Sequence, residues 1–339
     1  MDTRTLESGP GFLITDLPDA EIAVGPVRLG SKLIPGNATN YAREITYGFG
    51  LLGQKASGMT AGLKVDVEAR DDAVNGLAGE LAAQLSSGAI RCDPGLRAPA
   101  SAITALTADD PRPAARLADH GHGTLADHLE ARGVVAAARA VLGDLDGRRI
   151  TVEGNGAVAL EAMAALVAAG AKIVRVGALK TAVSGDALDP AAIAAATDGE
   201  ALAALGESAA AWTVWKGDVD LVVAGSAPGA LKDQGAAALG ATPVVTYGTA
   251  PVATKALATS MKAGGTVVPS FLTGIGRRVA DLADSDASAD GLIASTDEAL
   301  AAGLEASVGH ERGAFVGACL AAEAFIAGWT TPPFGRPLA

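Results

Sequence analysis

The sequence contains few cysteines and histidines, which excludes several classes of protein. There are two cysteines and four histidines among the 339 residues. Cys92 and Cys319 are too few and too far apart for a disulfide framework or a cysteine-rich metal cluster. The pair in His120-Gly121-His122 can contact a metal ion, but a polar, glycine-containing loop explains the same residues, and no zinc-ligand spacing is present. The sequence therefore predicts no metal site.

Long apolar runs and an excess of positive charge are also missing. No uninterrupted apolar stretch reaches the roughly 18 residues that span a bilayer, and the first residues lack the basic and apolar segments of a signal peptide. A net charge of −12 would repel a nucleic-acid backbone or an anionic membrane. We therefore expect a cytoplasmic protein with neither nucleic acid nor membrane as a partner.

Aromatic residues are scarce as well, at 4%, although hydrophobic residues as a whole make up 49%. Small aliphatic side chains must then fill the core, which favours helices packed closely on a sheet. The length suffices for two domains, each with its own core. Residues 107–123 are rich in Asp, Pro, Gly and His and predict a loop between them. We expect an α/β protein with one domain over residues 1–122, a second over 123–300, and C-terminal helices over 301–339 that return to the first.

The first domain has the pattern of a mixed α/β unit. Apolar residues 11–15 and 21–24 flank a turn signal at Asp16–Asp19 and predict a hairpin. Asn37 can cap a helix that ends near Leu52. Further along, the pattern predicts a strand over 61–67, a helix over 71–85 and a short strand over 89–92.

The second half alternates between strands and helices. A helix over 125–142 precedes a strand over 149–152, a helix over 158–169 and a strand over 172–176. Because such a crossover is right-handed, the two strands are expected to be parallel. The remaining expected elements are strands over 221–224, 242–247 and 266–269 and helices over 296–328.

A glycine-rich turn joins the strand over 149–152 to the next helix. Gly154, Gly156 and Ala159 fit G-x-G-x-x-A, in which the first glycine permits a tight turn and the second lets a pyrophosphate approach the backbone. The free amides of the helix N-terminus attract phosphate. The same residues are also compatible with a tight strand-to-helix turn that binds no cofactor. We predict a Rossmann-type dinucleotide-binding domain, with the following cofactor-binding residues: Gly154, Asn155, Gly156, Ala157, Val158, Ala178, Lys180, Gly225 and Ser226.

The end of the second strand bears on the choice of cofactor. NAD-binding turns usually carry an acid there for the ribose hydroxyls, but this strand ends in Gly177-Ala178. Without that acid, a 2′-phosphate meets no repulsion, and Lys180 can pair with it. NADP is therefore favoured over NAD, unless Lys180 is simply a solvated loop lysine.

Several segments resemble the glutamate/leucine/phenylalanine/valine dehydrogenases. Residues 146–158 are similar to that family's L-x-G-K-x-V-x-V-Q-G-x-G-x-V-G, and residues 168–174 to its E-x-G-A-K-V-V. Residues 131–134 and 218–223 resemble its G-R-G-V and D-C-D-V-L-I-P-A-A segments. Residues 45–63 align without a gap on the family's lysine-containing segment. The resemblance implies NAD(P)-linked oxidative deamination of an L-amino acid, a small-molecule substrate, and a homodimer or higher oligomer formed through the first domain.

The family's substrate-binding and catalytic residues are only partly present. By position, Gly48 and Thr60 replace its two lysines, and Gly274 replaces an asparagine. Arg28 fits a substrate-binding arginine, and Asp93 falls on the catalytic aspartate. Glu130 replaces a threonine beside the nicotinamide. The neighbouring Lys55 and Lys64 are not expected to replace the missing lysines, and Arg28 and Arg97 remain possible anion partners.

These replacements lead to three hypotheses. Without its cations the site disfavours a bound carboxylate, and a threonine hydroxyl does not stabilise charge as an ammonium does. The first is an NAD(P)-dependent oxidoreductase that acts on an amine, imine or carbonyl compound and is inefficient toward ordinary L-amino acids. In this hypothesis Asp93 is the acid or base, and Thr60 and Glu130 lie at the reacting centre. The second is non-redox chemistry that uses Glu130. The third is a non-catalytic binding subunit.

Overall fold

The computed structural model describes residues 1–95, 97–99, 101–108 and 110–339, and the side chain of Ile103 lies outside this description. The chain forms two compact units. Unit 1 comprises residues 1–113, 281–287 and 322–337, and unit 2 comprises residues 114–280, 288–321 and 338–339. The division at 113/114 falls inside the loop that composition predicts. Helices α12 (Ile275–Leu282) and α14 (Ala314–Ala327) each contribute residues to both units.

Unit 1 is built on a five-stranded mixed sheet with the strand order β1-β2-β4-β3-β5. Its strands are β1 (Asp2–Thr5), β2 (Gly11–Thr15), β3 (Ala23–Leu29), β4 (Ser57–Leu63) and β5 (Ile90–Pro94). Its other elements are α1 (Pro35–Leu51), η1 (Val67–Ala69), α2 (Arg70–Glu80), α3 (Ala82–Ser86) and α4 (Ser101–Thr107). Apolar side chains fill its core, among them Val27, Met59 and Leu77, each fully buried.

The predicted hairpin between residues 11–15 and 21–24 is wrong. Strand β2 pairs with β1 and β4, and β3 pairs in parallel with β4 and β5. The segment between them is an anchored loop, because the buried Asp16 carboxylate accepts a bond from Arg43 at 2.9 Å and the Leu17 amide donates to the Ser57 hydroxyl at 2.8 Å. These partners are distant in sequence, so local turn residues do not reveal them.

Several element boundaries also differ from those predicted. Helix α1 begins at Pro35 after Ile34, so Asn37 lies inside its first turn and is not the cap; proline suits this position because its missing amide hydrogen is not needed there. Strand β4 ends at Leu63 and begins four residues before the predicted start. The helix predicted over 71–85 is divided at Leu81 into α2 and α3.

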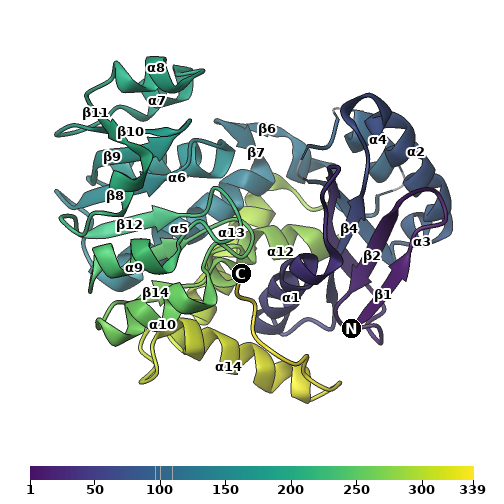
Figure 1. The fold of residues 1–339 in the computed structure, drawn as a ribbon. Helices are drawn as coiled ribbons and strands as arrows, with labels where there is room; N and C mark the ends of the chain where they lie inside the picture. Colours follow the sequence, from purple (N-terminus) through teal and green to yellow (C-terminus); the bar gives the residue numbers. More distant parts are fainter. Residues whose placement is uncertain (96, 100, 109) are drawn as a thin grey trace. The chain divides into compact units, whose positions relative to one another are not determined.

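Unit 2 contains a seven-stranded sheet with the order β11-β10-β9-β8-β12-β13-β14 (Figure 1). Its strands are β8 (Arg149–Glu153), β9 (Lys172–Ala178), β10 (Thr181–Ser184), β11 (Glu207–Ala210), β12 (Leu221–Ala224), β13 (Val244–Thr246) and β14 (Val267–Val268). The five strands from β9 to β14 in this order are parallel, as predicted. Strands β10 and β11 are antiparallel additions at one edge that the sequence pattern did not indicate.

Helices surround this sheet, together with a small hairpin formed by β6 (Asp119–His120) and β7 (Gly123–Thr124). The helices are η2 (Ala114–Leu117), α5 (Leu125–Leu142), α6 (Ala157–Ala168), α7 (Pro190–Ala195), α8 (Gly199–Ala203), η3 (Ala211–Trp215), α9 (Asp233–Leu239), α10 (Thr254–Lys262), α11 (Ser270–Thr273) and α13 (Ala289–Ser307). Helix α6 packs against α5, and α9 packs against α10. A capping box between Thr124 and Asp127 fixes the start of α5. The observed fold is the predicted α/β class with a Rossmann-type parallel sheet.

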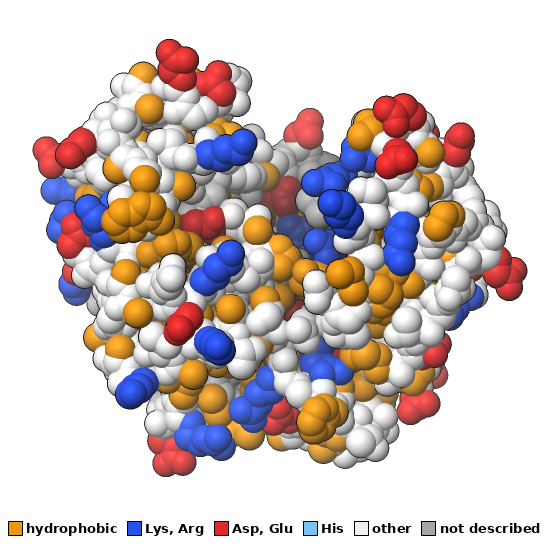
Figure 2. Space-filling view, viewed as in Figure 1, with side chains coloured by type: hydrophobic (Ala, Val, Ile, Leu, Met, Phe, Trp, Pro, Cys, Tyr) orange, Lys and Arg blue, Asp and Glu red, His pale blue; other side chains and the backbone are white. Residues whose placement is uncertain are grey.

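Among the described residues, none of the helices combines the length and the apolar character needed to cross a bilayer. Acidic, basic and hydrophobic side chains are interspersed over the face of the protein in Figure 2. On that face, the net negative charge of the sequence does not produce a surface of acidic side chains alone.

Candidate functional site

The carboxyl ends of β8 and β12 define the candidate site in unit 2. From β8 the chain crosses to β9 on one side, and the later strand β12 pairs with β8 on the other side. Ligands of open parallel sheets bind where the strand order reverses in this way. Gly154 follows β8 directly and Gly225 follows β12, so the glycine-rich turn lies at this point.

The first glycine of the turn is required by both dihedral angle and space. Gly154 has φ +114°, which residues with a side chain rarely adopt, and its amide donates to the Gly177 oxygen at 2.8 Å. A β-carbon on Gly154 would lie 2.2 Å from the Tyr247 hydroxyl oxygen. That hydroxyl donates to the main-chain oxygen of Glu153 at 2.7 Å. Burial raises the pKa of Tyr247 well above its usual value, and the nearby Glu153 and Glu130 charges add to the effect.

The second and third positions of the pattern have different surroundings. Gly156 is the N-cap of α6 and is exposed, and a β-carbon there would meet no protein atom within 4 Å. Ala159 is fully buried, in keeping with the close packing that a small third residue allows. The open side of the turn at Gly156 therefore leaves space for a group to approach the helix N-terminus.

A pocket of about 360 Å³ adjoins the turn. It lies in unit 2 and includes five of the predicted cofactor residues, namely Gly154, Asn155, Ala178, Lys180 and Ser226. Trp212 and Trp215 of η3 also line it, and Trp212 is 68% exposed. The remaining predicted residues, Gly156, Ala157, Val158 and Gly225, belong to the same turn and to the segment after β12. The structure thus places all nine predicted cofactor residues at the ends of β8, β9 and β12.

Glu153 is a residue of this site that the sequence analysis did not select. Its Oε2 accepts the amides of Gly225 and Ser226, each at 3.0 Å, and its Oε1 accepts the Ser226 hydroxyl. Among the residues that line the pocket, Glu153 is the one acid and Lys180 the one base. Its position could have identified it from the sequence, because Glu153 immediately precedes Gly154, where the dehydrogenases that this segment resembles have glutamine. Its carboxylate therefore orders the segment after β12 and brings a negative charge to the turn.

Lys180 occupies a strained turn. Leu179 and Lys180 form the two-residue connection between β9 and β10. The φ angle is +51° at Leu179 and +69° at Lys180. Two consecutive positive values are typical of a type I′ hairpin turn, which usually contains Asn or Gly. The exposed Lys180 side chain is at the pocket, where the sequence analysis expected a partner for a 2′-phosphate.

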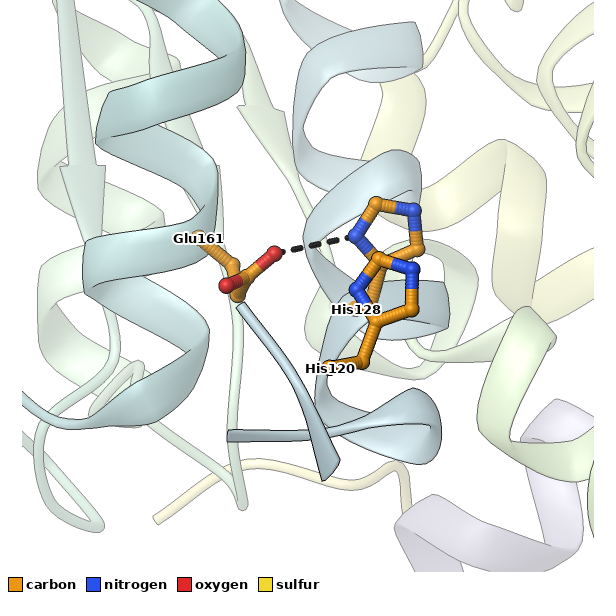
Figure 3. Close-up of side chains that lie close together, drawn as sticks. All are labelled: His120, His128 and Glu161. Atoms are coloured by element: carbon orange, nitrogen blue, oxygen red, sulfur yellow. Dashed lines mark hydrogen bonds and ion pairs between the residues drawn. The ribbon is translucent and has the colours of Figure 1, made fainter. Parts of the chain in front are cut away.

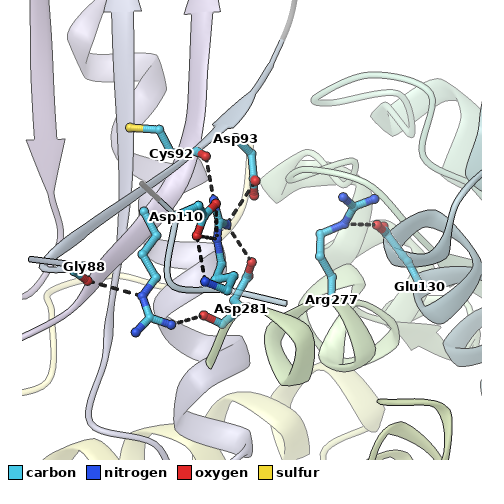
Figure 4. Close-up of polar contacts among 9 residues, drawn as sticks. Gly88, Cys92, Asp93, Asp110, Glu130, Arg277 and Asp281 are labelled. Carbon is cyan, nitrogen blue, oxygen red and sulfur yellow. Dashed lines mark hydrogen bonds and ion pairs between the residues drawn. The ribbon is translucent and has the colours of Figure 1, made fainter. Parts of the chain in front are cut away.

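In unit 1, Asp93 belongs to an ion-pair cluster. Arg112, whose side chain is fully buried, lies 3.0 Å from Asp93, 2.6 Å from Asp110 and 3.1 Å from Asp281 (Figure 4). Arg112 also donates to the Cys92 oxygen at 2.7 Å. Burial opposes the charge on Arg112, yet the three carboxylates raise its pKa above its already high usual value. Asp93 is the carboxylate most open to solvent, with 19% of its side chain exposed.

The two residues that the sequence resemblance aligns with lysines of the dehydrogenases, Thr60 and Gly48, are buried in unit 1. Thr60 in β4 is fully buried, and its hydroxyl donates to the Pro26 oxygen at 3.2 Å. Gly48 is a buried residue of α1. Arg28 in β3 lies over the ring of Tyr41, with its guanidinium carbon 4.3 Å from the ring centroid, an arrangement typical of a cation–π contact. Lys55 and Lys64 are exposed.

Glu130 in α5 is held by two partners in unit 2. One oxygen accepts the Gly248 amide at 2.6 Å, and the other accepts from Arg277 Nε at 2.9 Å (Figure 4). Arg277 also pairs with Asp127 at 2.7 Å. Although burial raises the pKa of Asp127, the Arg277 charge and the bonds from Thr124 bring it below its usual value. Gly274 ends α11, and its amide donates to the Ser270 oxygen at 2.7 Å.

The fold is similar to solved structures of amino acid dehydrogenases. A hetero-hexameric glutamate dehydrogenase of Thermus thermophilus, in a leucine-bound form, superposes with a TM-score of 0.77 over 96% of this chain and 87% of that one, at 22% identity. A glutamate dehydrogenase of Plasmodium falciparum gives a TM-score of 0.73 over 96% and 81%, at 13% identity. The L-tryptophan dehydrogenase of Nostoc punctiforme gives 0.65 over 97% and 96%, at 15% identity.

Neither a family model nor a curated protein matches the sequence. The likeness therefore concerns the fold, and it confirms the resemblance to the amino acid dehydrogenases at that level. The chain shares the two-domain fold of these structures, with a Rossmann-type sheet in unit 2.

Proposed function

We propose that this protein is an NAD(P)-dependent oxidoreductase whose substrate is an amine, imine or carbonyl compound without an exposed α-carboxylate. The observation that carries the proposal is the turn at Gly154 and Gly156, which lies at the strand-order reversal beside a pocket of about 360 Å³. A β-carbon on Gly156 would meet no protein atom within 4 Å, which leaves room for a pyrophosphate at the start of α6.

The pocket beside the turn supports a dinucleotide as the cofactor. The exposed Trp212 offers an aromatic face on which a flat base can stack. Lys180 offers a positive charge at the end of β9, and β9 ends without an acid that would repel a 2′-phosphate. These features support NADP over NAD.

The residues in unit 1 support a substrate other than an ordinary L-amino acid. Thr60 is buried and bonded to the main chain, and Gly48 has no side chain. Neither position supplies the cation that a bound carboxylate requires. In the proposed reaction, a bound nicotinamide would supply or take up a hydride, and Asp93 would give or take the accompanying proton. Because position 60 carries no ammonium to stabilise the developing charge, we expect no efficient deamination of L-amino acids.

The test is calorimetric titration of the full chain with NADPH, NADP, NADH and NAD. Gly156→Asp should abolish binding of the preferred dinucleotide, because it places a carboxylate where the phosphates approach. The fold should persist, since aspartate is a good N-cap and has space there. Gly309→Asp is the matched control at another exposed glycine whose β-carbon meets nothing within 4 Å. Equal binding by Gly156→Asp and the wild type would place the nucleotide elsewhere.

Turnover is measured next, with the dinucleotide that binds and a panel of imines and carbonyl compounds. Oxidation of NADPH or NADH that depends on one of these compounds supports the proposal. Rapid deamination of ordinary L-amino acids would contradict the substrate assignment.

Glu153 favours a second candidate, in which the same scaffold performs non-redox chemistry or binds without catalysis. Its carboxylate lines the pocket next to the turn and disfavours phosphate there. Failure of all four dinucleotides to bind would reject the redox proposal in favour of this one.

We also propose a homo-oligomer assembled through unit 1. The strand β1 lies at the edge of its sheet, and an edge strand presents unpaired main-chain groups to a second copy. Sedimentation of the purified chain tests this: a dimer or larger species supports it, and a monomer at micromolar concentration rejects it.

A further inference from the structure

Three side chains from separate elements of unit 2 meet beside the β6–β7 hairpin. They are His120 of β6, His128 of α5 and Glu161 of α6 (Figure 3). A ligating atom from each lies within 4.8 Å of the other two. His128 Nδ1 is 2.9 Å from Glu161 Oε2, and the centroids of the two imidazole rings are 4.0 Å apart.

The polar atoms of this cluster are incompletely satisfied by the protein. His120 Nδ1 is buried and has no hydrogen-bond partner within the described part of the chain. Buried polar groups are normally paired, and an exception calls for an explanation such as an ion. A hydrogen bond between His128 and Glu161 accounts for their contact but leaves His120 Nδ1 without a partner. One metal ion would satisfy both rings and the carboxylate.

The surrounding backbone is shaped to hold the Glu161 carboxylate. Glu161 is 7% exposed, and its Oε1 accepts the His122 amide, which leaves Oε2 toward the rings. Gly121 has φ +55°, and a β-carbon there would lie 2.0 Å from Glu161 Oε1. Gly121, which lies between His120 and His122, therefore lets the hairpin pack closely against the Glu161 carboxylate.

We propose that His120, His128 and Glu161 bind one divalent ion of the zinc type, with water as the fourth ligand. Zinc takes imidazole nitrogen and carboxylate oxygen at about 2.0–2.2 Å in a tetrahedron, which places neighbouring ligand atoms about 3.3 Å apart. The ligand atoms of the cluster lie within 4.8 Å of one another, so side-chain rotations that bring them closer complete the site. Two nitrogens and one oxygen favour zinc over calcium or magnesium, which prefer oxygen ligands.

The proposed site lies where the β6–β7 hairpin, α5 and α6 meet. Glu161 lies four residues after Ala157, the first residue of α6. A β-carbon on Gly123 would lie 2.6 Å from the Ala157 β-carbon, so the hairpin is seated on the start of that helix. A bound ion links the hairpin and α5 to the helix that follows the glycine-rich turn. This inference does not depend on the proposed redox function.

The test uses the full chain after treatment with a chelator, titrated calorimetrically with zinc chloride. We expect one ion per chain and a rise in melting temperature, because the ion binds the folded state. His120→Gln and Glu161→Gln should each weaken binding on the order of 100-fold or more, since even changes to residues supporting metal ligands cost 10- to 100-fold. His122→Gln is the matched control, because it keeps the main-chain amide that donates to Glu161 and changes a side chain outside the three proposed ligands. Cobalt should give a visible spectrum in the wild type and the control that His120→Gln lacks.

His120→Gln keeps the test decisive even if Glu161→Gln does not fold, since His120 Nδ1 makes no hydrogen bond to the described residues that the substitution would remove. Absence of stoichiometric zinc binding would overturn the proposal. Equal zinc affinity in the wild type, His120→Gln and His122→Gln would also overturn it, because the ion would then bind elsewhere.

Discussion

The Tyr247 hydroxyl lies 2.2 Å from the place that a β-carbon on Gly154 would occupy. Because Gly154 also has φ +114°, we expect Gly154→Ala to lower the free energy of unfolding by about 3 kcal/mol. Tyr247→Phe removes the hydroxyl and should recover part of this loss in the double variant, although alone it costs about 1 kcal/mol for the lost hydrogen bond.

Urea unfolding of the two single variants and the double variant measures this coupling. Gly309→Ala is the control, with an expected change within about 0.5 kcal/mol. A Gly154→Ala protein as stable as the wild type would show that the turn relaxes freely.

Lys180 should determine the preference between the two dinucleotides. Its exposed ammonium lies at the pocket, so we expect Lys180→Ala to weaken NADPH binding about tenfold and to leave NADH binding nearly unchanged. Lys172→Ala removes the same charge from the opposite end of β9 and is the control. Calorimetry with both nucleotides decides the matter: an equal effect on NADPH and NADH would exclude contact with a 2′-phosphate.

Arg277 should be needed for the stability of unit 2. Arg277→Met leaves the Glu130 and Asp127 carboxylates without their shared cation. Since Arg277 is partly exposed, we expect a loss of about 2 kcal/mol, against less than about 1 kcal/mol for Arg132→Met, whose pair with Asp297 is largely exposed. Chemical denaturation measures both.

The same ion pair has a pH dependence with a defined sign. The folded-state pKa of Asp127 is below its usual value, so its contribution is present above the unfolded pKa of about 3.9 and is lost as the pH falls through the folded value. Asp127→Asn should therefore reduce the acid sensitivity of stability. An acid transition identical to that of the wild type would contradict this.

Asp93 and Arg112 should separate catalysis from folding. Asp93→Asn removes the most exposed of three carboxylates around one arginine. We expect it to lower turnover at least 100-fold while the melting temperature stays within about 4 °C. Asp110→Asn alters the same cluster and should retain turnover. Arg112→Met removes the buried cation that the three carboxylates share and should cost about 3 kcal/mol or more. Equal losses of turnover in Asp93→Asn and Asp110→Asn would contradict a specific role of Asp93.

Cys92 should make the folded state sensitive to alkali. Burial, followed by the charge of Asp93, raises the pKa of the Cys92 thiol to about 12. The unfolded thiol ionises near pH 8.5, so the free energy of unfolding should fall by about 1.4 kcal/mol per pH unit above that value. Cys92→Ala lacks the contribution of this thiol, so its free energy of unfolding should fall less steeply with pH. Urea unfolding between pH 7.5 and 10.5 compares the two slopes, and parallel curves would refute the assignment.

The sequence predicts the elements of unit 2 better than those of unit 1, for a physical reason. In unit 2, consecutive elements pack against one another, so the strand, the Gly154 turn and the helix after it are visible as one local pattern. In unit 1, β4 lies between β2 and β3 although it follows both in the sequence. The Asp16 loop is fixed by Arg43 and Ser57, which no local pattern shows.

The candidate sites follow the same rule. The residues of the glycine-rich turn are adjacent in sequence and could be predicted. The amides of Gly225 and Ser226, which donate to Glu153, lie more than 70 residues further along the chain. Glu161 is 33 residues from His128, so their meeting depends on the packing of α6 on α5. The burial of the Thr60 hydroxyl against Pro26 likewise depends on how β4 lies in its sheet.

Unit 1 is assembled from segments that are far apart in the sequence. During translation these segments therefore become available for folding at different times. Glu323 accepts the Tyr47 hydroxyl at 3.0 Å, and Arg43 donates to the Gly335 oxygen at 3.2 Å. A ribosome releases residues 322–337 only after nearly all of unit 2 has emerged. Helix α1 therefore lacks these partners until the inserted unit has been synthesised. We expect nascent chains stalled before residue 322 to be preferred substrates of chaperones.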